Sequence, residues 1–312
     1  MSVGNNFVRD IRYAWLNGAL TRVGADRNIL ENYIRELRVY EACVIKARPV
    51  GFFSLWLEVV GQLYACKQAG VKPTVYFGPD CLYWDESRLE RNVWDYYFEP
   101  VSDIDWRQVD ERKAFQSSRY LYGVIPERWV DEERRRNIGQ IISDKIKIRP
   151  EILEQIERRN GGLIAGRKFV SVHARGTAKS EDLRYQYRGV LPLEYYWREV
   201  DRYLHGDADL AVYLATDSEE IVNKFKKRYG DRLFTSQVKR SEEETGEIHL
   251  KGGNFELGLE VLADCCLLRK GVALVHGVSN VSFAAAYWEP ELKHIDVYQK
   301  YAWQSRRRWL WS

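Results

Sequence analysis

The sequence lacks any apolar run that approaches the roughly 20 residues of a membrane-spanning helix. Its N-terminal stretch, MSVGNNFVRDIRYAW, lacks the basic-then-apolar order of a secretory signal peptide. It also lacks an excess of one charge, because 48 Lys and Arg stand against 45 Asp and Glu, a net charge of +3. We therefore expect a cytoplasmic protein that is not a dedicated nucleic-acid binder.

Metal-binding patterns are also missing. The five cysteines are odd in number, show no metal-ligand spacing and indicate reduced thiols. No DxD-like metal pair stands out, and Asp207 and Asp209 precede a predicted strand and so lie at the wrong end for a sheet-edge site. We therefore expect no metal and no cofactor, with any phosphate charge met by protein cations.

What the sequence does contain is typical of a folded globular protein, with 45% hydrophobic and 30% charged residues. A chain of 312 residues is long enough for two cores. The 11 Trp and 20 Tyr residues are unusually many. Such aromatic residues line many sugar-binding surfaces, but core packing explains most of them equally well.

The N-terminal half contains a strand–loop–helix–strand pattern. Residues 26–40 have helical spacing, 42–45 form a short strand, 52–70 form a largely buried helix and 71–77 form the next strand. Gly51 precedes the buried helix, where it either faces a phosphate or simply forms a turn, and the turn is favoured.

Residues 81–105 are dense in aromatic and acidic side chains without clear periodicity. They form either part of an acceptor groove or packing around the N-terminal sheet, and we favour packing.

The C-terminal half alternates strands and helices, which predicts a parallel, doubly wound sheet. Helices are expected at 126–142 and 150–158, and Asn160-Gly161-Gly162 is expected to end the second one. The remaining predicted elements are strands at 169–173, 210–215, 232–235 and 272–276, and helices at 191–204, 218–229, 254–269 and 283–288.

Polar side chains follow three of these predicted strands. They are His173 and Arg175, then Thr216 and Asp217, then His276 followed by Ser279, Asn280 and Ser282. Because parallel strands end at the same edge of a sheet, and ligands bind there, these residues should converge on one site.

Each candidate residue has a functional and an ordinary interpretation. Arg175 either pairs bidentately with a diphosphate or makes a surface ion pair. Ser279, Asn280 and Ser282 either cradle an anion at a helix N-terminus or simply cap the helix. Asp264 lies on an apolar helix and needs a partner, either a helix–loop hydrogen bond or a purine such as guanine.

Five segments in order, VSVHARGTAKSED, VYLATDS, EIHLKGGN, LADCCLL and HGVSNVSFAAAY, resemble the GDP-fucose-dependent α1,6-fucosyltransferase superfamily. The resemblance implies an α/β fold of the GT-B type, with two facing Rossmann-like domains built on parallel sheets. It implies an acceptor-side domain over residues 1–160 and a nucleotide-sugar-binding domain over 161–298. Residues 299–312 form an aromatic and basic tail.

The resemblance also implies roles for individual residues. Arg175 is expected on the β-phosphate, and Glu181 or Asp182 as the catalytic base. The expected donor-binding residues are His173, Lys179, Asp217, His249, Asp264, Ser279, Asn280, Val281 and Ser282, with Gly51 from the N-terminal half. The chain departs from the family pattern at Gly176 and Ala178, where the family often has Arg and Asp.

The expected function is an inverting, metal-independent transfer of fucose from GDP-fucose to an oligosaccharide or glycolipid. Two alternatives stay open, a transferase for another nucleotide sugar and a nucleotide-sugar-binding or carbohydrate-binding protein without turnover. The tail carries Trp303, Trp309 and Trp311 among arginines, which fits peripheral contact with an anionic membrane. Packing back on the N-terminal domain is the favoured alternative for this tail.

Overall fold

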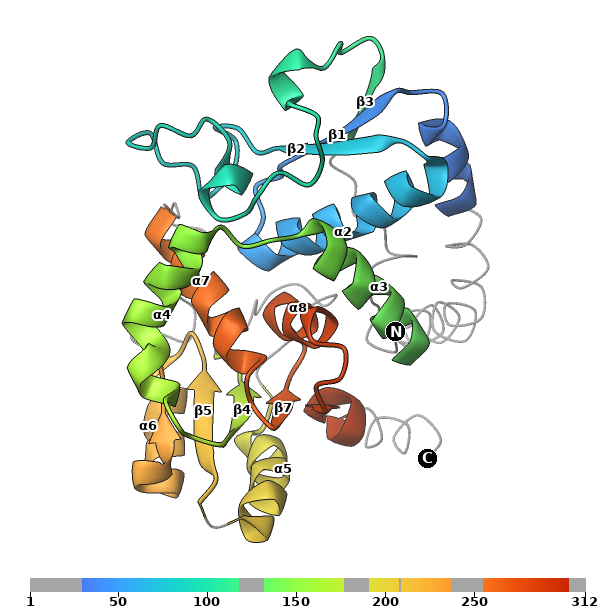
Figure 1. Cartoon of the computed structure of the whole chain (residues 1–312). Coiled ribbons are helices and arrows are strands. Elements are labelled where there is room, and N and C mark those ends of the chain that lie inside the picture. Colours follow the sequence, from blue (N-terminus) through green and yellow to red (C-terminus); the bar gives the residue numbers. More distant parts are fainter. Residues whose placement is uncertain (1–29, 118–131, 177–190, 208, 237–254, 303–312) are drawn as a thin grey trace, which may run out of the picture.

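The computed structural model describes residues 30–117, 132–176, 191–207, 209–236 and 255–302. Within these ranges the chain forms two parallel sheets, one with strand order β2-β1-β3 and one with order β6-β5-β4-β7-β8. Figure 1 shows the smaller sheet above the larger one, with helices packed between and around them. The predicted α/β class with two Rossmann-like sheets is confirmed.

The smaller sheet contains the predicted strand–helix–strand unit. Strand β1 (Ala42–Lys46) is followed by α2 (Phe52–Ala69) and then by β2 (Lys72–Tyr76), which pairs in parallel with β1. Helix α2 ends at Gly70, whose φ of 73° is the left-handed conformation that glycine adopts without strain. Strand β3 (Ala114–Ser117), which was not predicted, completes the sheet beside β1.

The larger sheet is wound by helices on both faces. Its strands are β4 (Phe169–His173), β5 (Ala211–Ala215), β6 (Leu233–Phe234), β7 (Ala273–His276) and β8 (His294–Asp296). The helices of this half are α3 (Glu132–Lys145), α4 (Pro150–Ile164), α5 (Leu193–Gly206), α6 (Glu219–Tyr229), α7 (Phe255–Leu268) and α8 (Asn280–Trp288). Strand β8 was not predicted, and a π-helical turn (Tyr298–Ala302) follows it.

Two helix boundaries differ from the prediction. Helix α4 continues through Asn160-Gly161-Gly162 to Ile164, because the buried Asn160 amide donates to the Ile156 carbonyl and Ile164 packs against the core. The predicted domain boundary at residue 160 therefore falls inside a helix. Helix α8 begins at Asn280 rather than at residue 283, because Ser279 caps it.

The strands of the larger sheet alternate their side chains between two apolar layers. Phe169 and Tyr213 join the layer that contains α7, whereas Val170 and Val212 join the layer with α5 and α6. Burial on both faces is the expected environment of a parallel sheet.

The two halves share one core. The layer with α7 belongs to the same apolar cluster as α2 and the segment around residues 93–98. The ring of Trp56 stacks on that of Trp288, with centroids 4.9 Å apart. The Tyr97 ring stacks on Phe255, and its hydroxyl donates to the Phe255 carbonyl at 2.9 Å. The predicted packing role of residues 81–105 is confirmed, since the rings of Tyr83, Trp94, Tyr96, Tyr97 and Phe98 are buried in this cluster.

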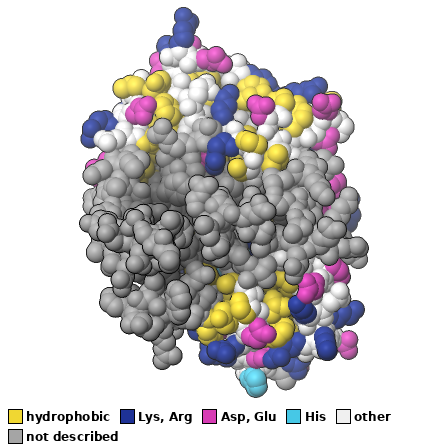
Figure 2. Space-filling model, turned by 180° about the vertical axis from the view of Figure 1, so that it is seen from behind, with side chains coloured by type: hydrophobic (Ala, Val, Ile, Leu, Met, Phe, Trp, Pro, Cys, Tyr) yellow, Lys and Arg dark blue, Asp and Glu magenta, His cyan; other side chains and the backbone are white. Residues whose placement is uncertain are grey.

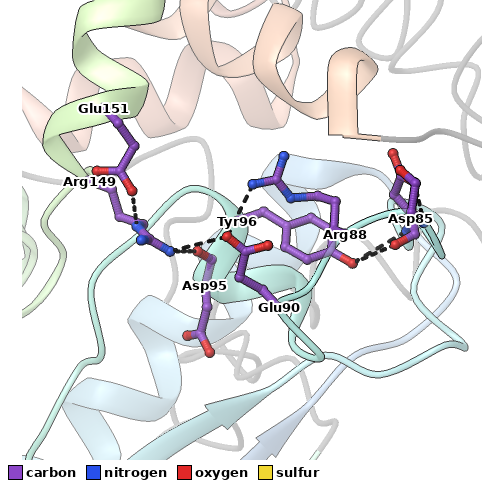
Figure 3. Close-up of polar contacts among 8 residues, drawn as sticks. Asp85, Arg88, Glu90, Asp95, Tyr96, Arg149 and Glu151 are labelled. Carbon is purple, nitrogen blue, oxygen red and sulfur yellow. Dashed lines mark hydrogen bonds and ion pairs between the residues drawn. The ribbon is translucent and has the colours of Figure 1, made fainter.

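Polar contacts connect the aromatic segment, residues 81–105, to the start of α4 (Figure 3). Arg149 pairs with Glu151 at 2.6 Å and donates to the Asp95 carbonyl at 2.6 Å. Arg88 pairs with Glu90 at 3.2 Å, and its guanidinium lies 4.0 Å from the centroid of the Phe255 ring. The Arg88 guanidinium therefore adds a cation–π contact to the apolar packing between the halves.

The described parts of the face drawn in Figure 2 show no concentration of one charge. Lys and Arg side chains are interspersed with Asp and Glu over the described parts of that face. None of the described helices is both long enough and apolar enough to cross a bilayer.

Candidate functional site

The carboxyl edge of the larger sheet brings three predicted strand ends together. In the strand register His173 lies beside Ala215 on one side and beside His276 on the other. The polar residues that follow β4, β5 and β7 therefore lie at one edge, as predicted. Strand β8 adds Asp296, which lies beside His276.

The N-terminus of α8 lies at this edge, directly after β7. Ser279 has an extended conformation, and its hydroxyl accepts a hydrogen bond from the Val281 amide at 3.3 Å. Ser279 therefore acts as an N-cap in this structure. The helix terminus still presents a partial positive charge to the edge, which favours an anion there.

His173 at the end of β4 is held by the first turn of α8. Its Nδ1 lies 2.9 Å from the Oγ of Ser282, a residue that is fully buried. The backbone is joined as well, because the Gly277 amide donates to the His173 carbonyl at 3.3 Å. Ser282 therefore orients the His173 ring rather than facing solvent.

Arg175 follows β4 by two residues and is half-buried. Its backbone neighbours are fixed, since the Ala174 amide donates to the Ala215 carbonyl at 3.2 Å and the Gly176 amide donates to Asp217 Oδ1 at 2.6 Å. No carboxylate within the part of the chain that the structure describes pairs with the Arg175 guanidinium.

Asp264 of α7 makes contacts within the protein. Its Oδ1 accepts hydrogen bonds from Tyr213 of β5 at 2.8 Å and from Ser236. Asp264 therefore makes the kind of hydrogen bond that the sequence analysis gave as one alternative, except that Tyr213 lies on a strand and not in a loop. Its predicted contact with guanine or ribose stays a prediction.

Gly51 lies in the other half, at the start of α2. The amide of Phe52 donates to the Tyr83 hydroxyl at 2.8 Å, so this helix N-terminus already has one protein partner. A Cβ at Gly51 would meet nothing within 4 Å, and its φ of −62° is an ordinary value. Neither packing nor conformation therefore requires glycine here, and its predicted phosphate contact stays untested.

The remaining predicted residues lie outside the described ranges. They are Lys179, Glu181, Asp182 and His249, which stay predictions.

Two histidines, His276 at the end of β7 and His294 at the start of β8, were not predicted as a pair. His276 is fully buried, its Nδ1–H donates to the Gly277 carbonyl at 2.8 Å, and its Nε2 lies 3.1 Å from Nδ1 of His294. Burial lowers the pKa of His276, although the nearby Asp296 carboxylate opposes this. Partial desolvation and the adjacent His276 ring also lower the pKa of His294, and both rings are therefore neutral at pH 7.

The described residues contain no group of three or more His, Cys, Asp or Glu side chains placed to hold a metal ion. At the edge lie the Arg175 guanidinium and the N-terminus of α8, together with the carboxylates of Asp217 and Asp296. A guanidinium and a helix N-terminus are groups that bind an anion.

Comparison by sequence finds no matching family model and no matching curated protein. Comparison by structure does find matches. The fucosyltransferase NodZ from Bradyrhizobium has a TM-score of 0.51 and 15% identity over 79% of this chain and 92% of that chain. POFUT1 in complex with GDP has a TM-score of 0.50 and 10% identity over 81% of this chain and 96% of that chain.

These likenesses define the class of fold. The chain has the GT-B fold of the GDP-fucose fucosyltransferases, and the resemblance predicted from the sequence is confirmed at the level of the fold. Another NodZ structure, soaked with GDP-fucose, matches equally well, with a TM-score of 0.51 and 15% identity over 80% of this chain and 92% of that chain.

Proposed function

We propose that this chain is a glycosyltransferase that transfers fucose from GDP-fucose to a hydroxyl group of a glycan. The observation that carries the proposal is the Arg175 guanidinium, half-buried and without a carboxylate partner among the described residues, at the exit of the central strand. It lies two residues beyond His173, which contacts the first turn of α8. A nucleoside diphosphate is the kind of ligand that a guanidinium and a helix N-terminus bind together.

The proposed mechanism is a single displacement with inversion at the anomeric carbon. The acceptor oxygen forms a bond to that carbon while the bond to the diphosphate oxygen breaks and its electron pair leaves with GDP. The acceptor proton passes to a carboxylate, Glu181 or Asp182. Arg175 and the N-terminus of α8 stabilise the charge that develops on the leaving diphosphate.

We further propose that this reaction requires no metal ion, because Arg175 and the helix N-terminus supply positive charge at the leaving group. Initial rates with EDTA and with added Mg²⁺ or Mn²⁺ test this directly. Equal rates are expected, and a rate that depends on the added cation would show that protein charge alone is insufficient.

A donor screen tests the central proposal. The thermal midpoint of the full chain should rise most with GDP and GDP-fucose, and less with UDP, CMP or ADP sugars, because binding to the folded state alone stabilises it. A larger rise with another nucleotide sugar would assign that donor instead. Transfer of labelled fucose to a glycan panel then separates an enzyme from a binding protein without turnover.

We propose an oligosaccharide or a glycolipid as acceptor, held on the side of residues 1–160. A glycolipid acceptor would place the protein at the inner face of a membrane, where the basic and aromatic residues of 303–312 contact anionic headgroups. Co-sedimentation with liposomes of anionic and of neutral lipid, with and without residues 303–312, tests this contact. Equal sedimentation of both chains would favour the packed tail.

A further inference from the structure

We propose that Asp217 is a positioning residue, whose carboxylate fixes the backbone of the loop that carries Arg175. This goes beyond the donor contact predicted for Asp217 from the sequence, and it rests on the proposed function for the role of Arg175. The contact that supports it joins two strand exits. Asp217 follows β5 and accepts a hydrogen bond from the Gly176 amide, which follows β4, at 2.6 Å.

The turn after β5 is built so that Asp217 points toward the exit of β4. The Ser218 amide donates to Thr216 Oγ1 at 3.3 Å, and the Ser218 hydroxyl caps α6 by accepting from the Ile221 amide at 3.4 Å. Thr216 and Ser218 are therefore used within their own turn and helix. The Asp217 carboxylate instead accepts a hydrogen bond from the neighbouring strand exit, at the Gly176 amide.

Arg175 lies between two anchored amides. On one side Ala174 extends the ladder between β4 and β5, through its bond to Ala215 at 3.2 Å. On the other side Gly176 is held by Asp217 through a short, charge-assisted bond. The Cα of Arg175 is therefore fixed by main-chain contacts on both sides, which limits where its guanidinium lies. A catalytic cation must be preorganised in this way to act at a fixed leaving group.

The same turn explains why residue 176 is glycine. A Cβ built at Gly176 would lie 2.0 Å from the Cβ of Ser218, 2.9 Å from its Oγ and 3.2 Å from Asp217 Oδ1. Its φ is not positive, so close packing rather than conformation excludes a side chain. The arginine that the resembling family often has at this position does not fit here. The exit of β4 therefore carries Arg175 without a second arginine at the next position.

Asp217 is well suited to this role and poorly suited to contact the donor. A carboxylate that faced the diphosphate would repel it, whereas a carboxylate bonded to the loop amide is partly neutralised by its partner. The bond length of 2.6 Å is that of a strong contact between a charged acceptor and an amide. We therefore expect the effect of Asp217 on the reaction to pass through Arg175.

Variants at Asp217 test the proposal through a double-mutant cycle. Asp217→Ala should reduce kcat at least tenfold with a smaller change in KM, because the transition-state contact of Arg175 is disturbed. Asp217→Asn keeps an oxygen that accepts the Gly176 amide and should recover most of this loss. In an Arg175→Ala background, Asp217→Ala should have little further effect.

The opposite pattern would overturn the proposal. If Asp217→Asn were as poor as Asp217→Ala, and the losses of Asp217→Ala and Arg175→Ala simply multiplied, Asp217 would act on the substrate directly.

The glycine gives an independent test by rescue. Gly176→Ala should reduce turnover at least tenfold, because of the 2.0 Å contact with Ser218 Cβ. Ser218→Gly removes that atom, and glycine is tolerated at an N-cap. The double variant Gly176→Ala with Ser218→Gly should therefore recover most of the activity. Full activity of Gly176→Ala alone would contradict the packing argument.

Hydrogen exchange separates this proposal from the proposed function, because it needs no substrate. Exchange of the Gly176 amide should be slow in the unmodified chain and in Asp217→Asn, and at least tenfold faster in Asp217→Ala. Unchanged exchange of the Gly176 amide in Asp217→Ala would refute the positioning role of Asp217, whatever the activity. A chain that showed the expected exchange but bound no nucleotide sugar would instead refute the proposed function.

Discussion

Trp56 of α2 and Trp288 of α8 stack with an interplanar angle of 22°, and this pair joins the two sheets of the molecule through one apolar cluster. Trp56 is 1% exposed, so its indole lies fully inside that junction. The two halves of a GT-B fold here share a core, and they should unfold together rather than one after the other.

Trp56→Ala should therefore destabilise the whole chain by about 3–5 kcal/mol, the usual cost of emptying an aromatic core site. Equilibrium urea unfolding, followed by both fluorescence and circular dichroism, measures this. Leu89→Ala is the control, because Leu89 is 92% exposed and its loss should cost less than about 0.5 kcal/mol. Two separate transitions in the unmodified chain would show that the shared core does not couple the halves.

Two helical glycines should respond oppositely to alanine. A Cβ at Gly139 of α3 would lie 2.2 Å from Pro290 Cγ and 3.0 Å from the Tyr287 carbonyl oxygen, so Gly139→Ala forces α3 away from α8. A Cβ at Gly162 of α4 would meet nothing within 4 Å.

Gly139→Ala should cost about 1–3 kcal/mol through overpacking, whereas Gly162→Ala should stabilise by about 0.5–1 kcal/mol through the lower entropy of the unfolded chain. The thermal midpoints of the two variants test both predictions, a decrease for Gly139→Ala and an increase for Gly162→Ala. A neutral Gly139→Ala would mean that α3 and α8 separate at little cost.

Glu58 of α2 makes the stability of the protein depend on pH. Burial raises the pKa of Glu58 to about 7, although its bond to Arg48 at 2.7 Å opposes the shift. Its Oε1 has no hydrogen-bond partner within the described structure. Because the folded state holds this proton more tightly than the unfolded state, stability should fall as pH rises from about 4.5 to about 7.

Glu58→Gln should remove this dependence. The free energy of unfolding of the variant, relative to the unmodified chain, should be about 1–3 kcal/mol higher at pH 8 than at pH 4.5. Denaturant titrations at the two pH values measure the difference. A constant difference across the range would indicate that Arg48 keeps the carboxylate charged throughout.

His276 should make the stability of the protein depend on pH in the opposite direction to Glu58. Burial lowers the pKa of His276 in the folded state. Below about pH 6.5 the unfolded state therefore binds a proton at His276 that the folded state does not bind. The stability contribution of neutral His276 is therefore complete above that pH and decreases as the pH falls. The charged groups near the pair are Asp296, which favours protonation of His276, and Arg135, which disfavours protonation of His294.

His276→Asn removes the titrating ring and keeps a donor for the Gly277 carbonyl. Between pH 7.5 and pH 5 it should lose about 1–2 kcal/mol less stability than the unmodified chain. His205→Asn, a change at an exposed residue, is the matched control and should follow the unmodified chain.

The strands of the larger sheet were predictable where they are apolar runs followed by polar residues. Phe169–His173 agrees with its predicted bounds, and Ala211–Ala215 differs by one residue. Strands β3 (AFQS) and β8 (HID) were missed, because each is short, partly polar and paired only on one side. Such edge strands are specified by their neighbours rather than by their own sequence.

The convergence of the strand ends on one edge was also predictable, because it follows from parallel pairing alone. The bond between Asp217 and Gly176 was not predictable, because it joins residues 41 positions apart through the close packing of two turns. The orientation of His173 by Ser282 likewise depends on a contact across 109 positions. Sequence patterns identify the edge where a site lies, whereas the tertiary contacts decide which side chain faces the ligand.

Arg175 is the residue whose loss should most reduce transfer. Arg175→Ala removes the guanidinium that stabilises the leaving diphosphate, and the expected loss in kcat is about 10²–10³-fold. Arg175→Lys should recover only part of this loss, because an ammonium cannot pair bidentately.

Arg232→Ala provides the matched control. Arg232 is an exposed arginine just before β6, at the opposite edge of the same sheet, and its removal should leave turnover unchanged. Steady-state transfer from GDP-fucose, with circular dichroism to confirm the fold, compares the three variants. Full turnover by a folded Arg175→Ala protein would falsify the assignment of Arg175 to the diphosphate.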